Sequence, residues 1–167
     1  MRHPIRFSRG TRSLWPALGV FLAACNTTAT APAVAPALAA NVVAAIDTTL
    51  QDERHAESIY LRVLADHGNV LPFFNIVVAE QRHSASLEAL LRGRGLPVAE
   101  SPWTLDNVPR FPSVREACAA AATAEVDNVA LYDRFLSFDL PADVRQVFTA
   151  NRRASIEKHL PAFQLCR

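Results

Sequence analysis

Acidic and histidine side chains interrupt the apolar pattern of four long stretches of this chain, at positions that a helix would turn toward its packed face. The interruptions fall at Glu53, Glu57, Glu80, His83, Glu125 and His159. Burying an unpaired carboxylate costs several kcal/mol, so these groups need a common partner that compensates them. The simplest such partner is a metal ion, or a pair of ions, in the middle of a helix bundle.

The apolar residues of these stretches recur at alternating spacings of four and three, which is typical of helices that pack in a bundle. The pattern predicts helices over residues 43–67, 73–92, 113–137 and 141–165. Ser113, followed by Glu116 three residues later, is typical of a helix N-cap. Pro161 is expected to kink the fourth helix or to loosen its last turn. No stretch alternates with a period of two for long, so the predicted fold class is all-α.

The connections between these helices constrain the topology. Short links around Gly68–Asn69 and Asp139–Leu140 predict two antiparallel hairpins. Residues 93–112 join the hairpins; extended, they could cover up to ~65 Å, whereas a helix of 20-odd residues is only ~33 Å long. A link that crosses the whole bundle in this way is typical of a ferritin-like four-helix bundle. A simple up-and-down bundle with a floppy loop is the alternative.

Glu80 and His83 form a Glu-x-x-His pair, whose side chains lie next to each other on one helix face. At a rise of ~1.5 Å per residue, most of the acidic and histidine interruptions fall within about two turns of one another along the bundle. This convergence favours a metal site. The alternative is an ion-pair network without metal, whose cations would be Arg62, Arg82, Arg152 and Arg153.

Other polar residues near the pattern are weaker candidates. His55 and Asp127 project off the inward faces and are expected in solvent, and His67 at a helix end is expected to act as a cap. Tyr60 and Tyr132 are expected in the core, where a hydroxyl could reach the site. Carboxylate oxygens with one or two imidazoles suit iron or manganese and would also accept zinc.

Most of the chain from Val42 to Arg167 resembles a bacterial ferritin-like domain family of uncharacterised function. The resemblance is carried by the segments DERHAESIYLRVL, AEQRHSASLEALL, AEVDNVALY and EKHLPAF, of which AEQRH and KHLPAF are the more specific parts. It implies a four-helix ferritin-like fold with a dinuclear carboxylate site, whose ligands would be Glu53, Glu80, His83, Glu125 and His159. Glu57 is added as a ligand from the apolar pattern alone.

The fourth helix departs from the well-characterised di-iron proteins of this superfamily, which carry Glu-x-x-His on two helices. Ile156 stands three residues before His159, and Glu157 is expected to face away from it. The second ion would therefore lack a carboxylate, so a mononuclear or weak site is an alternative to a dinuclear one. The predicted inward positions of this helix are Phe148, Arg152, Ser155, His159, Ala162 and Cys166.

The first 24 residues are expected to be a targeting segment rather than part of the fold. Basic residues precede a short apolar run that is far below the ~20 residues needed to span a bilayer. The run ends in Leu22-Ala23-Ala24-Cys25, which resembles the lipobox of bacterial lipoproteins and implies that Cys25 is lipidated. The alternative is an ordinary secretory signal that is cleaved later, near Ala39-Ala40.

Residues 25–41 are expected to be a flexible tether, since after the cysteine they consist mainly of Ala, Thr and Pro and carry no charge. The folded domain is then expected over residues 42–167. The lipobox implies a protein anchored in the bacterial cell envelope, and Asn26 after the cysteine favours the outer membrane, facing the periplasm. The net charge of +1 gives no reason to expect nucleic acid as a partner.

Cys118 and Cys166 lie about equally far from the turn between the third and fourth helices. Antiparallel helices bring such positions together, and an exported protein sits in an oxidising compartment. The sequence therefore predicts a disulfide between these two cysteines.

Two functions remain open from the sequence. The leading hypothesis is a membrane-anchored ferritin-like protein that binds one or two transition-metal ions and could act as a metal-dependent oxidase. The alternative is a non-enzymatic helical envelope lipoprotein that serves as an interaction or structural module, with ion pairs in place of the metal. A phosphate-binding loop, a nucleophile–base pair and a hydrolase motif are all missing from the sequence.

Overall fold

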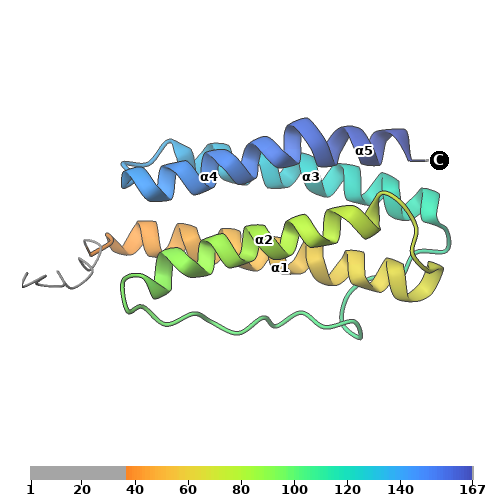
Figure 1. The fold of residues 1–167 in the computed structure, drawn as a ribbon, viewed down its shortest axis with the longest axis horizontal. Helices are drawn as coiled ribbons and strands as arrows, with labels where there is room; N and C mark the ends of the chain where they lie inside the picture. The colour runs from red at the N-terminus through yellow and green to blue at the C-terminus, as the bar shows by residue number, and fades with distance from the viewer. Residues whose placement is uncertain (1–36, 167) are drawn as a thin grey trace, which may run out of the picture. The chain divides into compact units, whose positions relative to one another are not determined.

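Residues 37–166 are described by a computed structural model of the chain. Its helices are α1 (Ala40–His67), α2 (Phe73–Arg92), α3 (Val114–Leu136), α4 (Ala142–Ala154), η1 (Ser155–His159) and α5 (Leu160–Leu165). The last three follow one another without a break and form the fourth helix of the bundle (Figure 1). Over this range the chain has no strand, which confirms the predicted all-α class. None of the helices in this range has the length and apolar character needed to span a bilayer.

The helix bounds follow the local signals in the sequence. Ser113 caps α3 by accepting a hydrogen bond from the backbone N–H of Glu116 at 3.2 Å, as its position predicts. Helix α1 begins at Ala40, inside the expected tether, and Leu38 before it already packs against the core. The expected signal segment, the lipidation of Cys25 and most of the tether lie outside the described residues.

The four helices are connected as two antiparallel hairpins (Figure 1). Helices α1 and α2 form the first hairpin, and α3 forms the second with α4 and its extensions. Residues 93–113 connect the hairpins and run the length of the bundle, as the long-link prediction requires. Helices α2 and α3 therefore run in the same direction, as do α1 and α4.

Side chains of α1 fix this long connection along its course. Arg54 donates to the Ala99 carbonyl at 2.5 Å, and the His67 ring lies 3.0 Å from the Phe111 carbonyl. Near the same end, Arg110 of the connection pairs with Asp66 at 2.9 Å. The crossover is thus tied to α1 at several points rather than hanging free in solvent.

The apolar core is divided into two clusters, one toward each end of the bundle. The first gathers residues from the start of α1, the end of α2, the end of α3 and the start of α4, and includes Leu50, Leu87 and Phe148. The second gathers the opposite ends of the same helices and includes Phe73 and Phe163. The polar residues singled out in the sequence lie on each helix between these two clusters.

The fourth helix contains a π-helical turn, η1, in which the backbone N–H of Leu160 bonds to the carbonyl of Ser155. Such turns widen a helix by one residue and are frequent at functional sites. Pro161 follows directly and has no N–H to offer the carbonyl four residues back, which favours an irregular turn here. The expected disturbance by Pro161 thus takes the form of a π-turn that carries His159.

The π-turn corrects the predicted inward face of the fourth helix. The buried positions are Val144, Phe148, Asn151, Ser155, His159 and Phe163. From Asn151 to Phe163 the buried residues are spaced by four. In a regular α-helix each such step would rotate the side chain by about 40° away from the inward face, and the wider π-turn removes this rotation. Arg152, which precedes the π-turn, pairs with Asp133 rather than facing inward. After the turn Phe163 is the buried residue, and its neighbour Ala162 packs only partly buried against the second apolar cluster.

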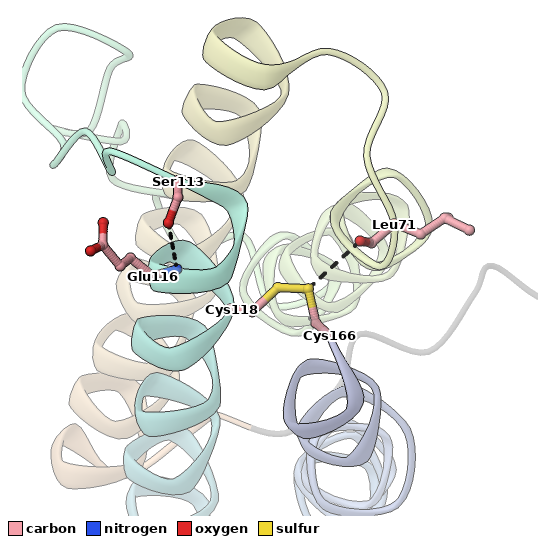
Figure 2. Close-up of a disulfide and its surroundings, with 5 residues drawn as sticks. All are labelled: Leu71, Ser113, Glu116, Cys118 and Cys166. Atoms are coloured by element: carbon pink, nitrogen blue, oxygen red, sulfur yellow. Dashed lines mark hydrogen bonds between the residues drawn. A yellow bond between two sulfur atoms is a disulfide. The ribbon is translucent and has the colours of Figure 1, made fainter.

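The structure joins Cys118 of α3 to Cys166 after α5 in the disulfide expected from the sequence (Figure 2). The two Cα atoms are 6.0 Å apart, and the sulfur of Cys166 lies 3.8 Å from the Leu71 carbonyl in the α1–α2 connection. The bridge therefore fastens the end of the chain to the second apolar cluster.

Removing this bridge should lower the stability of the bundle. For a separation of 48 residues, the chain-entropy model gives a loss of about 4 kcal/mol as an upper figure. The test is urea unfolding of a Cys118→Ser/Cys166→Ser variant beside the unmodified protein, with the unmodified protein under reducing conditions as the control. Peptide mapping under non-reducing conditions that finds both thiols free would contradict the disulfide itself.

Candidate metal centre

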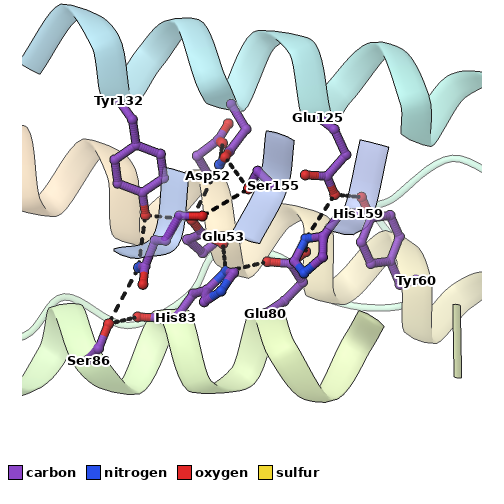
Figure 3. Close-up of polar contacts among 12 residues, drawn as sticks. Asp52, Glu53, Tyr60, Glu80, His83, Ser86, Glu125, Tyr132, Ser155 and His159 are labelled. Atoms are coloured by element: carbon purple, nitrogen blue, oxygen red, sulfur yellow. Dashed lines mark hydrogen bonds and ion pairs between the residues drawn. The ribbon is translucent and has the colours of Figure 1, made fainter. Parts of the chain in front are cut away.

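Glu80 occupies the middle of the polar region, and its two carboxylate oxygens face in different directions (Figure 3). Oε2 lies 3.1 Å from Nδ1 of His83, one turn further along α2. Oε1 lies 3.0 Å from Nδ1 of His159 on the fourth helix. Because the residue is only 2% exposed, both contacts form away from bulk solvent. Glu80 is therefore shared between two groups of potential ligands.

The first group consists of Glu53, Glu80 and His83, all of them buried. One potential ligand atom from each residue lies within 4.8 Å of the others. Nδ1 of His83 is 3.1 Å from Oε2 of Glu53 as well as from Glu80, so both carboxylates converge on one imidazole nitrogen. The residues come from α1 and α2, the first hairpin.

The second group consists of Glu80, Glu125 and His159, which meet the same distance criterion of 4.8 Å. Nδ1 of His159 lies 3.0 Å from Glu80 and 3.5 Å from Glu125, yet neither contact is aligned as a hydrogen bond. The nitrogen is fully enclosed and has no hydrogen-bond partner. The rings of His83 and His159 are stacked with centroids 5.4 Å apart, so the two groups are immediate neighbours.

Each outer carboxylate is held in place by a tyrosine hydroxyl. Tyr132 donates to Glu53 at 2.6 Å, and Tyr60 donates to Glu125 at 2.9 Å (Figure 3). Burial, followed by the charge of the neighbouring glutamate, raises the pKa of both phenols well above the ordinary value. Both tyrosines therefore remain neutral donors over the physiological range, which orients the two carboxylates toward the centre.

A layer of amide and hydroxyl groups supports the side nearest α3 and the fourth helix. Asn128 donates to Asp52 at 2.8 Å and to Glu53 at 3.3 Å, and it accepts from Ser155 at 2.8 Å. Asn151 donates to the Tyr132 hydroxyl at 3.0 Å. These partners satisfy the carboxylate and the phenol, and outer hydrogen bonds of this kind typically fix the orientation of metal ligands.

Asn128 and Asn151 belong to the site although the apolar pattern of the sequence did not single them out. Asn128 follows Glu125 by three residues, so helical spacing alone could have placed it on the same face. Asn151 follows Phe148 by three residues within the regular helix α4, so the same spacing could have placed it inward. Ser155 was placed on the inward face, and the structure shows it there with 1% exposure.

Without metal, the cluster holds extra protons on its imidazoles. Burial by itself lowers the pKa of His83, but the hydrogen bonds and charges of Glu53 and Glu80 outweigh it and raise that pKa to about 10. In the same way Glu125 and Glu80 overcome burial and raise the pKa of His159 to about 9.

The pKa values of Glu53 and Glu80 shift in opposite directions. Burial, followed by the charge of Glu80, raises the pKa of Glu53 to about 7. Burial also acts to raise the pKa of Glu80, but its close contacts with His159, His83 and Glu53 outweigh burial and lower that pKa. Glu80 is therefore the carboxylate that stays ionised at the centre of the cluster.

The buried donor set could hold a metal ion. Each group offers two carboxylates and one imidazole, a mixture that suits iron or manganese and also accepts zinc. The enclosed nitrogen of His159, without a hydrogen-bond partner, is aimed among the carboxylates as a ligand atom would be. With three protein donors in each group, an ion bound there would keep coordination positions open for water or a small reactant.

Glu57 does not join either group, which corrects its assignment as a ligand. It is half-buried, and its Oε1 accepts a hydrogen bond from Gln81 at 3.1 Å on the outer side of α1 and α2. A step of four residues carries it about 40° past Glu53 around the helix, and Tyr60 takes the next inward position. The spacing of four and three placed Glu57 among the predicted ligands, but its rotation around α1 keeps it out of both ligand groups.

The four arginines considered as alternative partners do not hold the cluster together. Arg62 pairs with Asp66, and Arg152 pairs with Asp133 at 2.6 Å on the outside of the bundle. Arg82 and Arg153 are exposed. The histidines are thus the cations that these described carboxylates contact in the absence of metal.

A cavity of about 230 Å³ lies between α1 and α3 and reaches Glu80 and Glu125. His55, expected in solvent, is half-buried at its edge and stacks on Trp103 of the crossover with ring centroids 4.0 Å apart. Asp127 is exposed, as expected, and also lines the cavity. The centre is therefore connected with the protein surface along the α1–α3 face.

Comparisons with models of protein families, with curated proteins and with solved structures found no match to this chain.

The stability of the metal-free protein should fall as the pH rises from about 6.5 to about 10. The folded-state pKa values of His83 and His159, about 10 and about 9, exceed the ~6.5 of an unfolded chain. The stabilisation is therefore complete below pH ~6.5 and is lost as the pH passes the folded values, by ~1.4 kcal/mol per pH unit for each proton retained.

Urea unfolding at several pH values in the presence of a chelator measures this dependence. Saturation with metal serves as the control, because metal-bound imidazoles have already lost the extra proton and the decline should disappear. Equal slopes with and without metal would contradict the assignment of these two histidines.

Proposed function

We propose that this protein is a ferritin-like metal-binding protein whose bundle holds two transition-metal ions, iron or manganese, bridged by Glu80. The observation that carries the proposal is the division of the two Glu80 oxygens between His83 at 3.1 Å and His159 at 3.0 Å. A carboxylate that faces one imidazole with each oxygen is placed to join two ions.

The departure at Ile156 defines the kind of dinuclear centre that we propose. Di-iron bundles with two Glu-x-x-His motifs have a second glutamate on the fourth helix. Here Ile156 is 38% exposed, and the interior position of that turn is taken by Ser155, which donates to Asn128. Because a π-turn has more residues per turn than an α-turn, a spacing of three no longer brings residue 156 beside His159. The proposed centre has one bridging carboxylate instead of two.

The chemistry that we propose for this centre is oxidation–reduction with a small reactant. When bound, iron or manganese would supply one-electron chemistry with dioxygen or peroxide at the positions that the protein leaves open. The chain itself supplies orientation, through Tyr60 and Tyr132, and excludes bulk water with the apolar clusters on both sides. His83 and His159 release protons when they become ligands.

The location of the protein in the cell is part of the proposal. The lipobox-like Leu22–Cys25 supports a lipid anchor on Cys25 in the bacterial envelope, with the bundle facing the periplasm. The disulfide between Cys118 and Cys166 is in keeping with an oxidising compartment. The anchor would make the membrane a partner of the chain, and the proposal includes no nucleic acid.

Metal titration of three variants tests the bridging role of Glu80. The full-length protein should bind two Mn(II) or, anaerobically, two Fe(II) per chain in equilibrium dialysis. Glu80→Gln should weaken binding at both positions by more than the roughly 10- to 100-fold that is typical when a hydrogen-bond partner of a metal ligand is lost. Glu53→Gln should affect one position. Glu57→Gln, a matched change on the outer side of α1, should retain both ions.

Two results would contradict the proposal. One is equal behaviour of Glu80→Gln and Glu57→Gln. The other is the absence of stoichiometric metal in the unmodified protein, combined with a loss of stability in His83→Ala that does not depend on added metal. The second result would support the helical envelope module with a buried ion-pair cluster.

A further inference from the structure

The cavity between α1 and α3 ends at the proposed centre, because Glu80 and Glu125 are among the residues that line it. Its walls carry small side chains from α3, namely Ala120, Ala121 and Ala124. At about 30 Å³ per water molecule in the liquid, a volume of about 230 Å³ has room for roughly seven waters. An octahedral divalent cation that keeps six waters fits such a space.

Negative charge dominates the lining of this cavity. Asp127 stands exposed at its outer edge, Asp52 is half-buried further in, and Glu80 and Glu125 close its inner end. Lysine and arginine are both missing from the residues that line it. A cleft lined by one sign of charge concentrates counter-ions and accelerates their association, so this cavity favours cations and disfavours anions.

Packed aromatic side chains close the two ends of the bundle to hydrated divalent cations. At one end the rings of Tyr60, Phe73 and Phe163 lie with centroids 4.9 to 5.4 Å apart. At the other end Phe148 packs against Tyr132 at 5.4 Å. Interiors packed in this way leave no space for a hydrated ion.

The crossover shapes the mouth of the cavity. Trp103 stacks on His55, and Phe111, whose carbonyl meets the ring of His67 at 3.0 Å, lines the cavity directly. The stacking leaves His55 half-buried at the edge, where an imidazole nitrogen and the Asp127 carboxylate can contact a passing cation.

We propose that divalent metal cations reach the Glu80 centre through this α1–α3 cavity, with Asp127 and His55 as transient ligands at its mouth. The inference rests on the proposed function and adds to it the route of the ion and its selection by charge. The route excludes anionic reactants and organic molecules larger than a hydrated ion.

Stopped-flow uptake of Co(II) by the full-length protein tests the route, since the visible absorption of the ion reports its arrival at the centre. Asp127→Asn should slow uptake by roughly threefold or more and reduce its dependence on ionic strength. Ala124→Leu, which fills the cavity without removing charge, should slow uptake by roughly tenfold. Both variants should reach the final absorbance of the unmodified protein, because neither residue is a ligand of the centre.

The matched controls are Asp139→Asn, which removes an exposed charge away from the cavity, and Ala130→Leu, which adds the same bulk at an exposed position of α3. Both should take up Co(II) at the unmodified rate. Thermal unfolding of all four variants identifies any change that acts through folding.

Three outcomes would overturn the inference. Unchanged uptake rates in both Asp127→Asn and Ala124→Leu would place the route elsewhere while leaving the proposed function intact. Equal slowing in the variants and in their controls would show a general effect of charge or bulk. Failure of the unmodified protein to take up any Co(II) would overturn the proposed function and the route together.

Discussion

The structure depends on the compensation of three buried carboxylates, Glu53, Glu80 and Glu125, which lie between two apolar clusters. Each is 3% exposed or less, and uncompensated charges in such a position would cost several kcal/mol each. Without metal the compensation comes from His83 and His159, which hold extra protons, and from hydroxyl and amide donors around them. The same arrangement brings six potential donor atoms together inside the bundle, so the groups that compensate the buried charge could also hold a metal ion.

The shared carboxylate of Glu80 links this compensation to the proposed chemistry. It contacts both imidazoles, each of which also contacts one outer carboxylate, and each outer carboxylate is held by a tyrosine. The centre is thus nearly symmetrical about Glu80, although the two halves come from different hairpins. The symmetry is broken on the fourth helix, where the π-turn directs Ser155 inward and leaves Ile156 in partial contact with solvent. The carboxylate that the fourth helix lacks would be a second bridge between the proposed ions. Each of the two groups that share Glu80 still has three potential donors.

Much of this arrangement could be predicted from the sequence, because helical spacing determines which residues share a face. The spacing of α1, α2 and α3 placed Glu53, Glu80, His83 and Glu125 inward, and the long connection predicted the crossover. Spacing could not decide whether Glu57 reaches the buried cluster. The pattern of four and three allows a rotation of about 40° around the helix, and that rotation turns Glu57 away from Glu53. Spacing also favoured Arg152 over Asn151 in α4, although both follow Phe148 at helical spacing, by four and by three residues. After the π-turn it placed Ala162 where Phe163 is buried, because a uniform helical period cannot represent such a turn. The cavity beside His55 depends on how Trp103 packs, which local sequence does not determine.

The bridge at Glu80 is tested most directly by electron paramagnetic resonance of the full-length protein loaded with Mn(II). Two ions joined by one carboxylate should be exchange-coupled, so we expect a multiline spectrum of a coupled pair at low temperature. The simple sextet of isolated Mn(II), observed at full loading, would contradict a shared Glu80 centre.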